Sequence, residues 1–306
     1  KVFDSLCQKL FLFLTIHDIM RVRQVMHVIF QEDINAILSH RYDQGADLWT
    51  TPDHKLLKGA PFTTLECATY LIELGMSQND EIIKQLAELI FSVWKDDGRF
   101  RISPNGGIYP CQSALAWQVL CRMGYASDER LIRTCTYFLN TQEDDGGWIC
   151  KKYSFGKGEE TMFSTPYTTL LVLDALRFYD IDSLVVNRAV DFLLNHWKIK
   201  RPISPCHYGI GTLFMQVEYP FRGYNIFYYV YILSFYETAI KDSRFKEAFE
   251  ALSSTLQDGK IVVQRVVPKL AKLSFCQKGK ISELATKHYL EIVENLKGDR
   301  KNEASI

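Results

Sequence analysis

Four segments of this chain begin with a proline and continue as an apolar helical pattern, and they recur at intervals of roughly 50 residues. The segments are PFTTLECATYLIELG from Pro61, PCQSALAWQVLCRMG from Pro110, PYTTLLVLDALRFY from Pro166 and PFRGYNIFYYVYILSFY from Pro220. Proline in the first turn of a helix costs no hydrogen bond and presets the backbone dihedral φ. The sequence therefore predicts four repeats, each with a helix that starts near its proline.

A second, one-sided helix is predicted between successive proline starts. Its apolar positions keep the 3.6-residue spacing, as in Ile82, Ile83, Leu86, Leu89, Ile90 and Val93, or in Leu131, Ile132, Cys135, Phe138 and Leu139. The proline-started helices are apolar nearly all round, which predicts burial on both sides. Two layers satisfy both patterns, and a closed ring also removes the exposed ends of an open solenoid. We expect one all-α domain over residues 1–296, with residues 297–306 as a frayed tail.

Acidic glycine turns follow the predicted outer helices, and DDGGW at residues 144–148 is one of them. Asp-Gly pairs tolerate left-handed backbone, and the aromatic residue that follows returns to apolar surface. Acids at this density are also used in proton-initiated and metal-assisted chemistry. Because Asp144 and Asp145 recur as Asp96 and Asp97 one repeat earlier, we interpret them as part of the architecture.

The overall charge argues against one class of partner. The 306 residues carry 36 basic and 36 acidic side chains, so no global field attracts phosphate polymers and no nucleic-acid partner is expected. The eight cysteines are scattered, and several fall in apolar helical patterns, so we expect reduced thiols and a cytoplasmic location. The run KLFLFLTIHDIM is too short for a transmembrane segment. The sequence leaves the oligomeric state open.

One repeat resembles a known family. The resemblance rests on Arg133, Tyr137, Phe138, Gln142, Gly146 and Trp148, which are similar to the glutamine-tryptophan repeat of the squalene and hopene cyclases and of the protein prenyltransferase β-subunits. It covers about residues 30 to 265, strongly in this repeat and weakly in the others. It implies an (α/α) toroid of five to six helix pairs with a central cavity. It also implies that Gln142 joins backbone groups of the outer helices and that Trp148 stacks on it.

The catalytic motifs of that family do not carry over. Class II cyclases protonate a double bond with the middle acid of an Asp-x-Asp-Asp motif, which does not occur here, and the DDxxD motif for diphosphate and magnesium is also missing. The prenyltransferases hold zinc with Asp-x-Cys and a later His. The nearest equivalents here are Tyr109-Pro110-Cys111 or Ser164-Thr165-Pro166, with Asn225 near the expected His. The resemblance therefore implies either a divergent enzyme or a toroid with another role.

Candidate pocket residues follow from the toroid, because residues just after each proline face the mouth of its cavity. We expect proton transfer by Glu66, Asp174 or Tyr224. We expect substrate binding by Gln112, Trp117, Tyr167, Arg222, Asn225 and Tyr228. Aromatic faces with a few polar tips suit an isoprenoid-like or other bulky apolar ligand. The competing interpretation is that the aromatic residues are plain core and that Glu66 pairs with Arg222.

Two functions stay open at this point. Either the cavity holds a terpenoid or prenyl-like substrate for a prenyltransferase- or cyclase-like enzyme, or it binds a lipid or peptide without chemistry. A buried acid with a raised pKa beside a cationic group would favour the enzyme, whereas a narrow cavity plugged by tyrosines of the fourth inner helix would favour binding or scaffolding. Helix N-termini carry positive dipole ends, so we expect the functional centre at the end marked by Pro110, Pro166 and Pro220, with Arg222 one turn inside.

A metal site has one weak sequence signal. Cys206 and His207 are adjacent, and a Cys-His pair supplies two zinc ligands in the lanthionine cyclases, which also have an (α/α) toroid. A third thiolate would have to come from elsewhere, such as Cys111 or Cys150. We therefore expect no metal or other cofactor, with zinc at Cys206 and His207 as the alternative. After the repeats, a last helical stretch is expected from Arg265 to Leu296.

Overall fold

The structure is a computed structural model that describes residues 28–298. Within this range it contains eleven α-helices and isolated β-bridges but no strand. The helices are α3 (Gln31–Ser39), α4 (Thr64–Glu73), α5 (Glu81–Ser92), α6 (Pro110–Leu120), α7 (Glu129–Asn140), α8 (Pro166–Leu176), α9 (Ser183–Ile199), α10 (Ile226–Leu233), α11 (Glu237–Lys241), α12 (Ser243–Ser253) and α13 (Glu283–Leu296). The predicted all-α class is confirmed for this part of the chain. The N-terminal apolar run and residues 299–306 of the predicted tail lie outside it.

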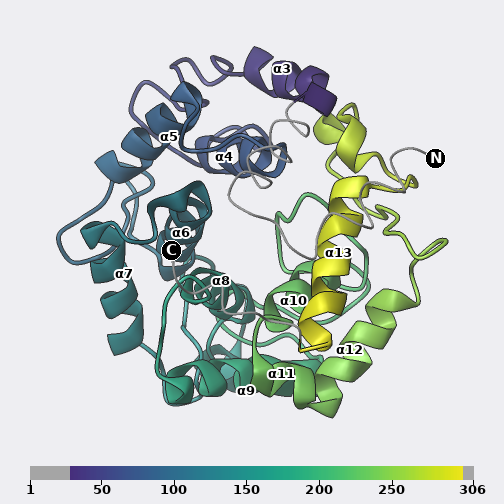
Figure 1. Ribbon diagram of the computed structural model, residues 1–306. Helices are drawn as coiled ribbons and strands as arrows, with labels where there is room; N and C mark the ends of the chain where they lie inside the picture. The colour runs from purple at the N-terminus through teal and green to yellow at the C-terminus, as the bar shows by residue number, and fades with distance from the viewer. Residues whose placement is uncertain (1–27, 299–306) are drawn as a thin grey trace.

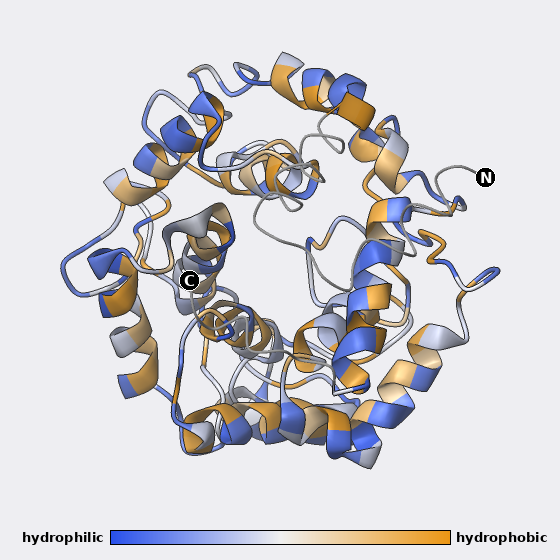
Figure 2. Cartoon of the chain, in the orientation of Figure 1, coloured by the Kyte–Doolittle hydropathy of each residue, from blue (hydrophilic) through white to orange (hydrophobic). Residues whose placement is uncertain are grey.

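The helices form two layers around the centre of the molecule (Figure 1). Helices α4, α6, α8, α10 and α13 lie nearer the centre, and α3, α5, α7, α9, α11 and α12 lie at the periphery. In Figure 2 the peripheral helices alternate hydrophilic and hydrophobic residues along their length. All residues of α10 are buried, whereas α7 buries only Leu131, Thr134, Cys135 and Phe138. The predicted difference between fully buried and half-exposed helices is therefore confirmed.

Two of the four predicted proline starts are confirmed. Pro110 and Pro166 stand in the first turn of α6 and α8. The residues before them, Tyr109 and Thr165, have extended backbone, as the residue before a proline prefers. The prolines therefore set where these two inner helices begin.

The predicted starts at Pro61 and Pro220 were wrong. Both prolines lie in loops, and the helices begin further along, after a polar residue that caps the first turn. Thr63 Oγ1 accepts a hydrogen bond from the backbone N–H of Glu66 at 3.3 Å, and Asn225 Oδ1 accepts one from a backbone N–H of α10 at 3.0 Å. A side-chain cap satisfies an N–H group that the helix leaves free, which a proline cannot do.

The acidic turn before α8 is held by one of its aspartates. The Asp145 carboxylate accepts hydrogen bonds from the backbone N–H of Gly147 at 3.1 Å and from the N–H and hydroxyl of Ser164 at 2.8 and 2.7 Å. These contacts join the turn to the segment that leads into α8. The geometry agrees with a structural role for Asp145.

The glycine of this turn is sterically required. Gly146 has a φ of +91°, and a Cβ atom there would lie 2.4 Å from the carbonyl oxygen of Arg188. Gly98, in the preceding repeat, has a φ of +85°, and its Cβ would lie 2.8 Å from the carbonyl oxygen of Arg133. Both turns pack against the backbone of an outer helix at a distance that only glycine permits. The two repeats thus share one turn architecture.

The glutamine of the same repeat connects neighbouring outer helices. Gln142 Nε2 donates hydrogen bonds to the carbonyl oxygens of Gly146 at 2.8 Å and Val185 at 2.9 Å, and Val185 belongs to α9. The buried Trp148 donates from Nε1 to the carbonyl oxygen of Phe138 at 2.8 Å and packs edge-on against that ring. The side chain of Gln142 therefore links the end of α7 to the next outer helix.

Contacts also join the first described helices to the last. Asp33 of α3 accepts a hydrogen bond from the backbone N–H of Ser274, ahead of α13, at 2.8 Å. In the inner layer, Glu73 at the end of α4 lies 2.6 Å from Nε2 of His288 in α13. These contacts bring the two ends of the described chain together in both layers.

The last helix is shorter than predicted. The helix expected from Arg265 begins only at Glu283, because Ser282 caps it by accepting a backbone N–H at 3.2 Å. The preceding residues form loops with two short 3-10 turns, Pro268–Leu270 and Ser274–Cys276. Among all helices of residues 28–298, none combines the length and the hydropathy that a membrane span requires.

Candidate functional site

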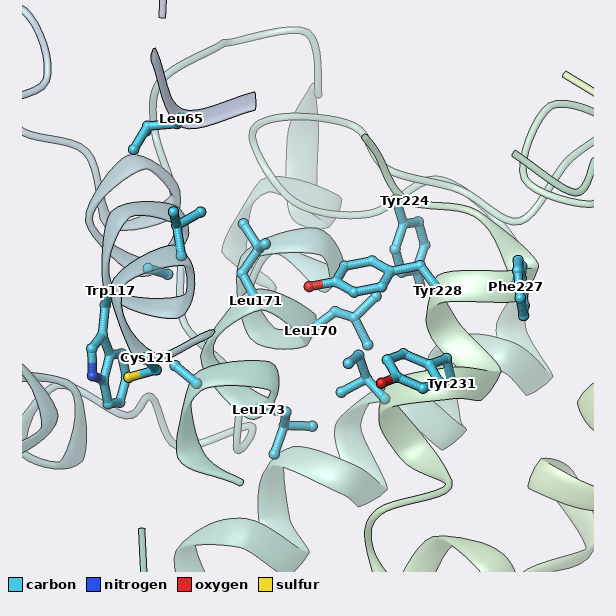
Figure 3. Packing of buried hydrophobic residues seen from close by; sticks show 14 of the residues in the cluster. Leu65, Trp117, Cys121, Leu170, Leu171, Leu173, Tyr224, Phe227, Tyr228 and Tyr231 are labelled. Atoms are coloured by element: carbon cyan, nitrogen blue, oxygen red, sulfur yellow. The ribbon is translucent and has the colours of Figure 1, made fainter. Parts of the chain in front are cut away.

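A small cavity lies between the inner helices. Its volume is about 20 Å³, and it is lined by Thr69, Leu115, Gln118, Arg122, Tyr167, Leu171, Phe221 and Tyr228. These residues come from α4, α6 and the turn that follows it, α8, α10 and the loop before α10. Figure 3 shows the ring of Tyr228 extending from α10 toward Leu171 on α8. The structure thus brings together two of the predicted substrate-binding residues, Tyr167 and Tyr228, in a narrow space partly filled by aromatic rings.

The charged side chain of this cavity is Arg122. Its Nη1 lies 3.0 Å from Glu73 Oε1, and its Nη2 lies 2.9 Å from Asp174 Oδ2. Asp174 is fully buried and also accepts hydrogen bonds from Arg177 Nε at 2.7 Å and from the Tyr228 hydroxyl at 2.7 Å. Burial works against the charged carboxylate, but Arg122 and Arg177 outweigh it and lower the pKa of Asp174. Asp174, predicted as a proton donor or acceptor, is therefore an ionised partner of two arginines.

The same network continues to α13. His288 Nε2 and the Tyr219 hydroxyl both contact Glu73 Oε2, at 2.6 and 3.0 Å. Burial opposes protonation of His288, yet the nearby Glu73 carboxylate raises its pKa overall. Glu291 lies 3.7 Å from His288 Nδ1 and accepts a hydrogen bond from Tyr231. The ion network therefore joins the carboxylates Glu73, Asp174 and Glu291 to the basic side chains Arg122, Arg177 and His288, and all of them except Glu291 are mostly buried.

The predicted catalytic residue Glu66 is paired with Arg222. Glu66 Oε1 accepts from Arg222 Nε at 2.9 Å and from Nη2 at 2.5 Å, and Thr63 donates to the other oxygen at 2.9 Å. Both charged side chains are mostly buried, with 17% and 14% of their surface exposed. Arg222 belongs to the loop before α10, so its prediction one turn inside that helix was wrong. The ion-pair interpretation of these two residues is the one that the geometry matches.

Two further predicted residues have other contacts. The Tyr224 hydroxyl lies 2.9 Å from Nδ1 of His196 on α9, and burial lowers the pKa of that histidine to about 4. Asn225 is the fully buried cap of α10. Neither side chain is among those that line the cavity. Their placement at the cavity mouth needs correction, because both side chains serve the packing and start of α10.

The two other predicted substrate-binding residues, Trp117 and Gln112, also lie outside the cavity lining. Trp117 Nε1 donates to the Tyr179 hydroxyl at 3.0 Å, and its ring stacks on Phe138 of α7 at 5.3 Å. Figure 3 shows Trp117 beside Cys121, away from Leu171 and Tyr228. Gln112 is buried in the first turn of α6 but does not line the cavity. Trp117 is therefore core between the two layers, because α6 is apolar on both sides.

One buried acid, in the loop before α10, was not among the predicted site residues. Glu218 is 7% exposed, and burial raises its pKa although Arg265 and Arg222 oppose that shift. Its Oε2 lies 2.5 Å from Arg265 Nη2. Glu218 does not line the cavity. It fulfils the predicted signature of a raised pKa beside a cation, but outside the space where a ligand would lie.

The two residues of the zinc alternative, Cys206 and His207, contact other groups. His207 points to Glu160, with Nδ1 at 3.1 Å from Oε1, and Cys206 instead contacts the carbonyl oxygen of Cys150 at 3.2 Å. Within residues 28–298, no group of three or more His, Cys, Asp or Glu side chains is arranged to hold a metal ion. The structure does bring Cys206 near Cys150 and Cys111, the two thiols considered as a third ligand.

Glu73 and Arg122 could have been found from one signal. Each is a charged residue at the end of a largely apolar helix or in the turn that follows it, where a buried charge requires a partner. His288 lies in α13, which carries several charged residues, so the same signal does not single it out. Comparison of the chain with models of known protein families and with curated proteins gave no match.

Proposed function

We propose that the chain is an (α/α) toroid related to the cyclase and prenyltransferase repeat, and that its cavity binds a small, uncharged, mainly apolar ligand without catalysing a reaction on it. The two layers of helices and the contacts that join α3 and α4 to the C-terminal segment support the toroid. If α13 is paired with α3, the ring has five helix pairs, which is within the five to six that the resemblance implies. The link from Gln142 to α9 supports the same relationship.

The proposal that the ligand is uncharged rests on the two ion pairs of Arg122. Among residues 28–298, Arg122 is the only charged side chain that lines the cavity, and its two terminal nitrogens already pair with Glu73 and Asp174. A prenyl diphosphate brings several negative charges, which proteins bind with unpaired arginines, lysines or a divalent cation. A buried charge without a partner is unfavourable by several kcal/mol. The cavity therefore favours a neutral molecule.

The acids nominated for catalysis also favour binding. Asp174 has a lowered pKa and three hydrogen-bond donors around it, so it is a poor proton donor near neutral pH. Glu66 is occupied by Arg222 and Thr63, and Tyr224 contacts α9. The cavity is narrow and is lined by Tyr228 of α10, the fourth inner helix, which favours a binding role.

Ligand entry requires side chains to move. A volume of about 20 Å³ holds little more than one water molecule. Phe221 lies in the loop before α10 and packs against Tyr228 at 5.0 Å, so these two rings form the movable wall. We expect binding to displace them and to add apolar contacts with Leu115 and Leu171.

The test compares a neutral isoprenoid with its charged counterpart. Geraniol should raise the melting temperature of the protein, whereas geranyl diphosphate at the same concentration should have little effect. Leu171→Trp fills the cavity and should abolish the response, while Leu184→Trp, at an exposed position of α9, should retain it. Geraniol recovered after incubation should be chemically unchanged. A larger shift with the diphosphate, no shift with either ligand, or conversion of geraniol would overturn the proposal.

Catalysis is the second candidate because of Glu218. Its raised pKa suits a general acid, and it lies beside Arg265 and near Arg222. This role would require the loop before α10 to carry Glu218 into the cavity. Conversion of geraniol by the wild-type protein, lost in Glu218→Gln without loss of fold, would establish it.

A further inference from the structure

Three cysteine side chains meet at the end where the inner helices begin. Cys111 lies in the first turn of α6, Cys150 in the loop before α8, and Cys206 in the loop before α10. The Sγ atoms of Cys111 and Cys150 are 3.2 Å apart, and Cys206 Sγ lies 3.2 Å from the carbonyl oxygen of Cys150. The first turn of one inner helix and the loops before the next two thus each bring one thiol to the same place. The proposed binding function does not use them.

The Cys111–Cys150 contact is chemically asymmetric. Cys150 is fully buried, whereas Cys111 is partly exposed and gives small solutes a route to the pair. The sulfur–sulfur contact lowers the pKa of Cys150 to about 6 and raises the pKa of Cys111. The contact therefore favours the thiolate of Cys150, and the thiolate is the reactive form of a cysteine.

We propose that Cys111 and Cys150 are a disulfide-forming pair that reacts with small peroxides and is restored by thiols. In the first step the thiolate attacks one peroxide oxygen, the O–O bond breaks, and the leaving hydroxide takes up a proton to become water. The second thiol then attacks the sulfenic sulfur, an S–S bond forms, and a second water leaves. Two thiols lose two electrons, and hydrogen peroxide gains them. A dithiol reverses the reaction by exchange.

The disulfide would connect two elements of the proposed binding site. It ties the first turn of α6 to the loop that leads into α8, and Tyr167 in the first turn of α8 lines the cavity. Cys206 lies beside the pair and supplies a third thiol that also interacts with Cys150, while its Sγ contacts the carbonyl oxygens of Cys150 and Tyr153. The Sγ–Sγ contact of 3.2 Å joins Cys150 to Cys111. We therefore assign the disulfide to Cys111 and Cys150 and not to Cys206.

Peptide mapping of the full chain tests this assignment. The reduced protein is treated with one equivalent of hydrogen peroxide at pH 7, alkylated under denaturing conditions and digested. We expect a crosslinked Cys111–Cys150 peptide that dithiothreitol removes. Cys135, whose pKa burial raises to about 11, is the internal comparison and should react at least about tenfold more slowly. The variants Cys111→Ser and Cys150→Ser should not form the crosslink, and Cys206→Ala should still form it.

Three results would overturn the inference. The first is retention of free thiols at both positions when Cys135 is already oxidised. The second is a crosslink to Cys206 instead. The third is a stoichiometric metal ion in the purified protein that blocks the reaction until a chelator removes it. Each is measured on the wild-type chain, so none depends on whether a cysteine variant folds. Failure of the geraniol test would leave this inference unaffected, because the two experiments read different sites.

Discussion

Replacing Asp174 with asparagine should strongly destabilise the protein. The carboxylate is fully buried and accepts hydrogen bonds from Arg122, Arg177 and Tyr228 at 2.9, 2.7 and 2.7 Å. Asparagine keeps the shape but removes the charge and turns one acceptor into an NH₂ donor. At least one of the three donors then faces another donor, and two arginines lose the carboxylate that they share.

The expected magnitude follows from burial. Removing one partner of a buried ion pair costs roughly 3–5 kcal/mol, because the remaining charge stays buried without compensation. The free energy of unfolding of a domain is about 5–15 kcal/mol, so Asp174→Asn should remove a large fraction of this stability. Asp97→Asn is the matched control: its side chain is 47% exposed and pairs with Arg99 at the surface, so the loss should stay below about 1 kcal/mol.

Urea denaturation followed by far-UV circular dichroism measures both variants. Arg122→Met should also be strongly destabilising, and the double variant with Asp174→Asn should lose less than the sum of the two, because the residues share one interaction. If Asp174→Asn loses less than about 1 kcal/mol, or if the two changes are additive, the buried ion network does not stabilise the fold as argued.

The remaining predictions concern the repeat turn and the pH dependence. Gly146→Ala should lower the free energy of unfolding, measured by urea denaturation, by about 2 kcal/mol or more, because its Cβ would lie 2.4 Å from a carbonyl oxygen. Gly158→Ala is the control and should lower it clearly less, because no atom lies within 4 Å of the added Cβ. Equal losses in the two variants would contradict the steric argument. Asp145→Asn should lower the free energy of unfolding by about 1–2 kcal/mol and Asp144→Asn should hardly change it, because the Asp145 carboxylate holds the turn. A larger loss in Asp144→Asn than in Asp145→Asn would refute that role. His288 has a raised pKa in the folded protein, so its stabilisation is complete below its unfolded value of 6.5 and is lost as the pH rises through the folded value. Denaturation between pH 6 and pH 9 should show this loss, and a His288→Gln variant that declines equally would exclude it.

Much of the fold could be predicted from the sequence because periodicity reports burial directly. The all-round apolar pattern of α8 and α10 and the one-sided pattern of α7 distinguished the layers before any coordinates. Helix starts were less predictable, because a proline marks a start only where no better cap follows it. Thr63 and Asn225 were such caps, and their role depends on a local side-chain geometry that the spacing of prolines does not contain.

The site could be predicted only in part. Tyr167 and Tyr228 follow from their position near the start of an inner helix, and both line the cavity. The prediction that Trp117 lines the cavity was wrong, because the sequence of a helix that is apolar all round does not show which side faces the centre. The contact between Glu73 and His288 escaped prediction because it joins residues far apart in the chain, and no local pattern shows which buried charges become partners.

Native mass spectrometry in a mixture of the two ligands tests whether the cavity prefers the neutral one. The full chain is incubated with equal concentrations of geraniol and geranyl diphosphate, and both complexes are read in one spectrum. We expect a one-to-one geraniol complex that Leu171→Trp eliminates, with no specific diphosphate complex, because both terminal nitrogens of Arg122 already pair with carboxylates. A dominant geranyl diphosphate complex, sensitive to the same substitution, would contradict it.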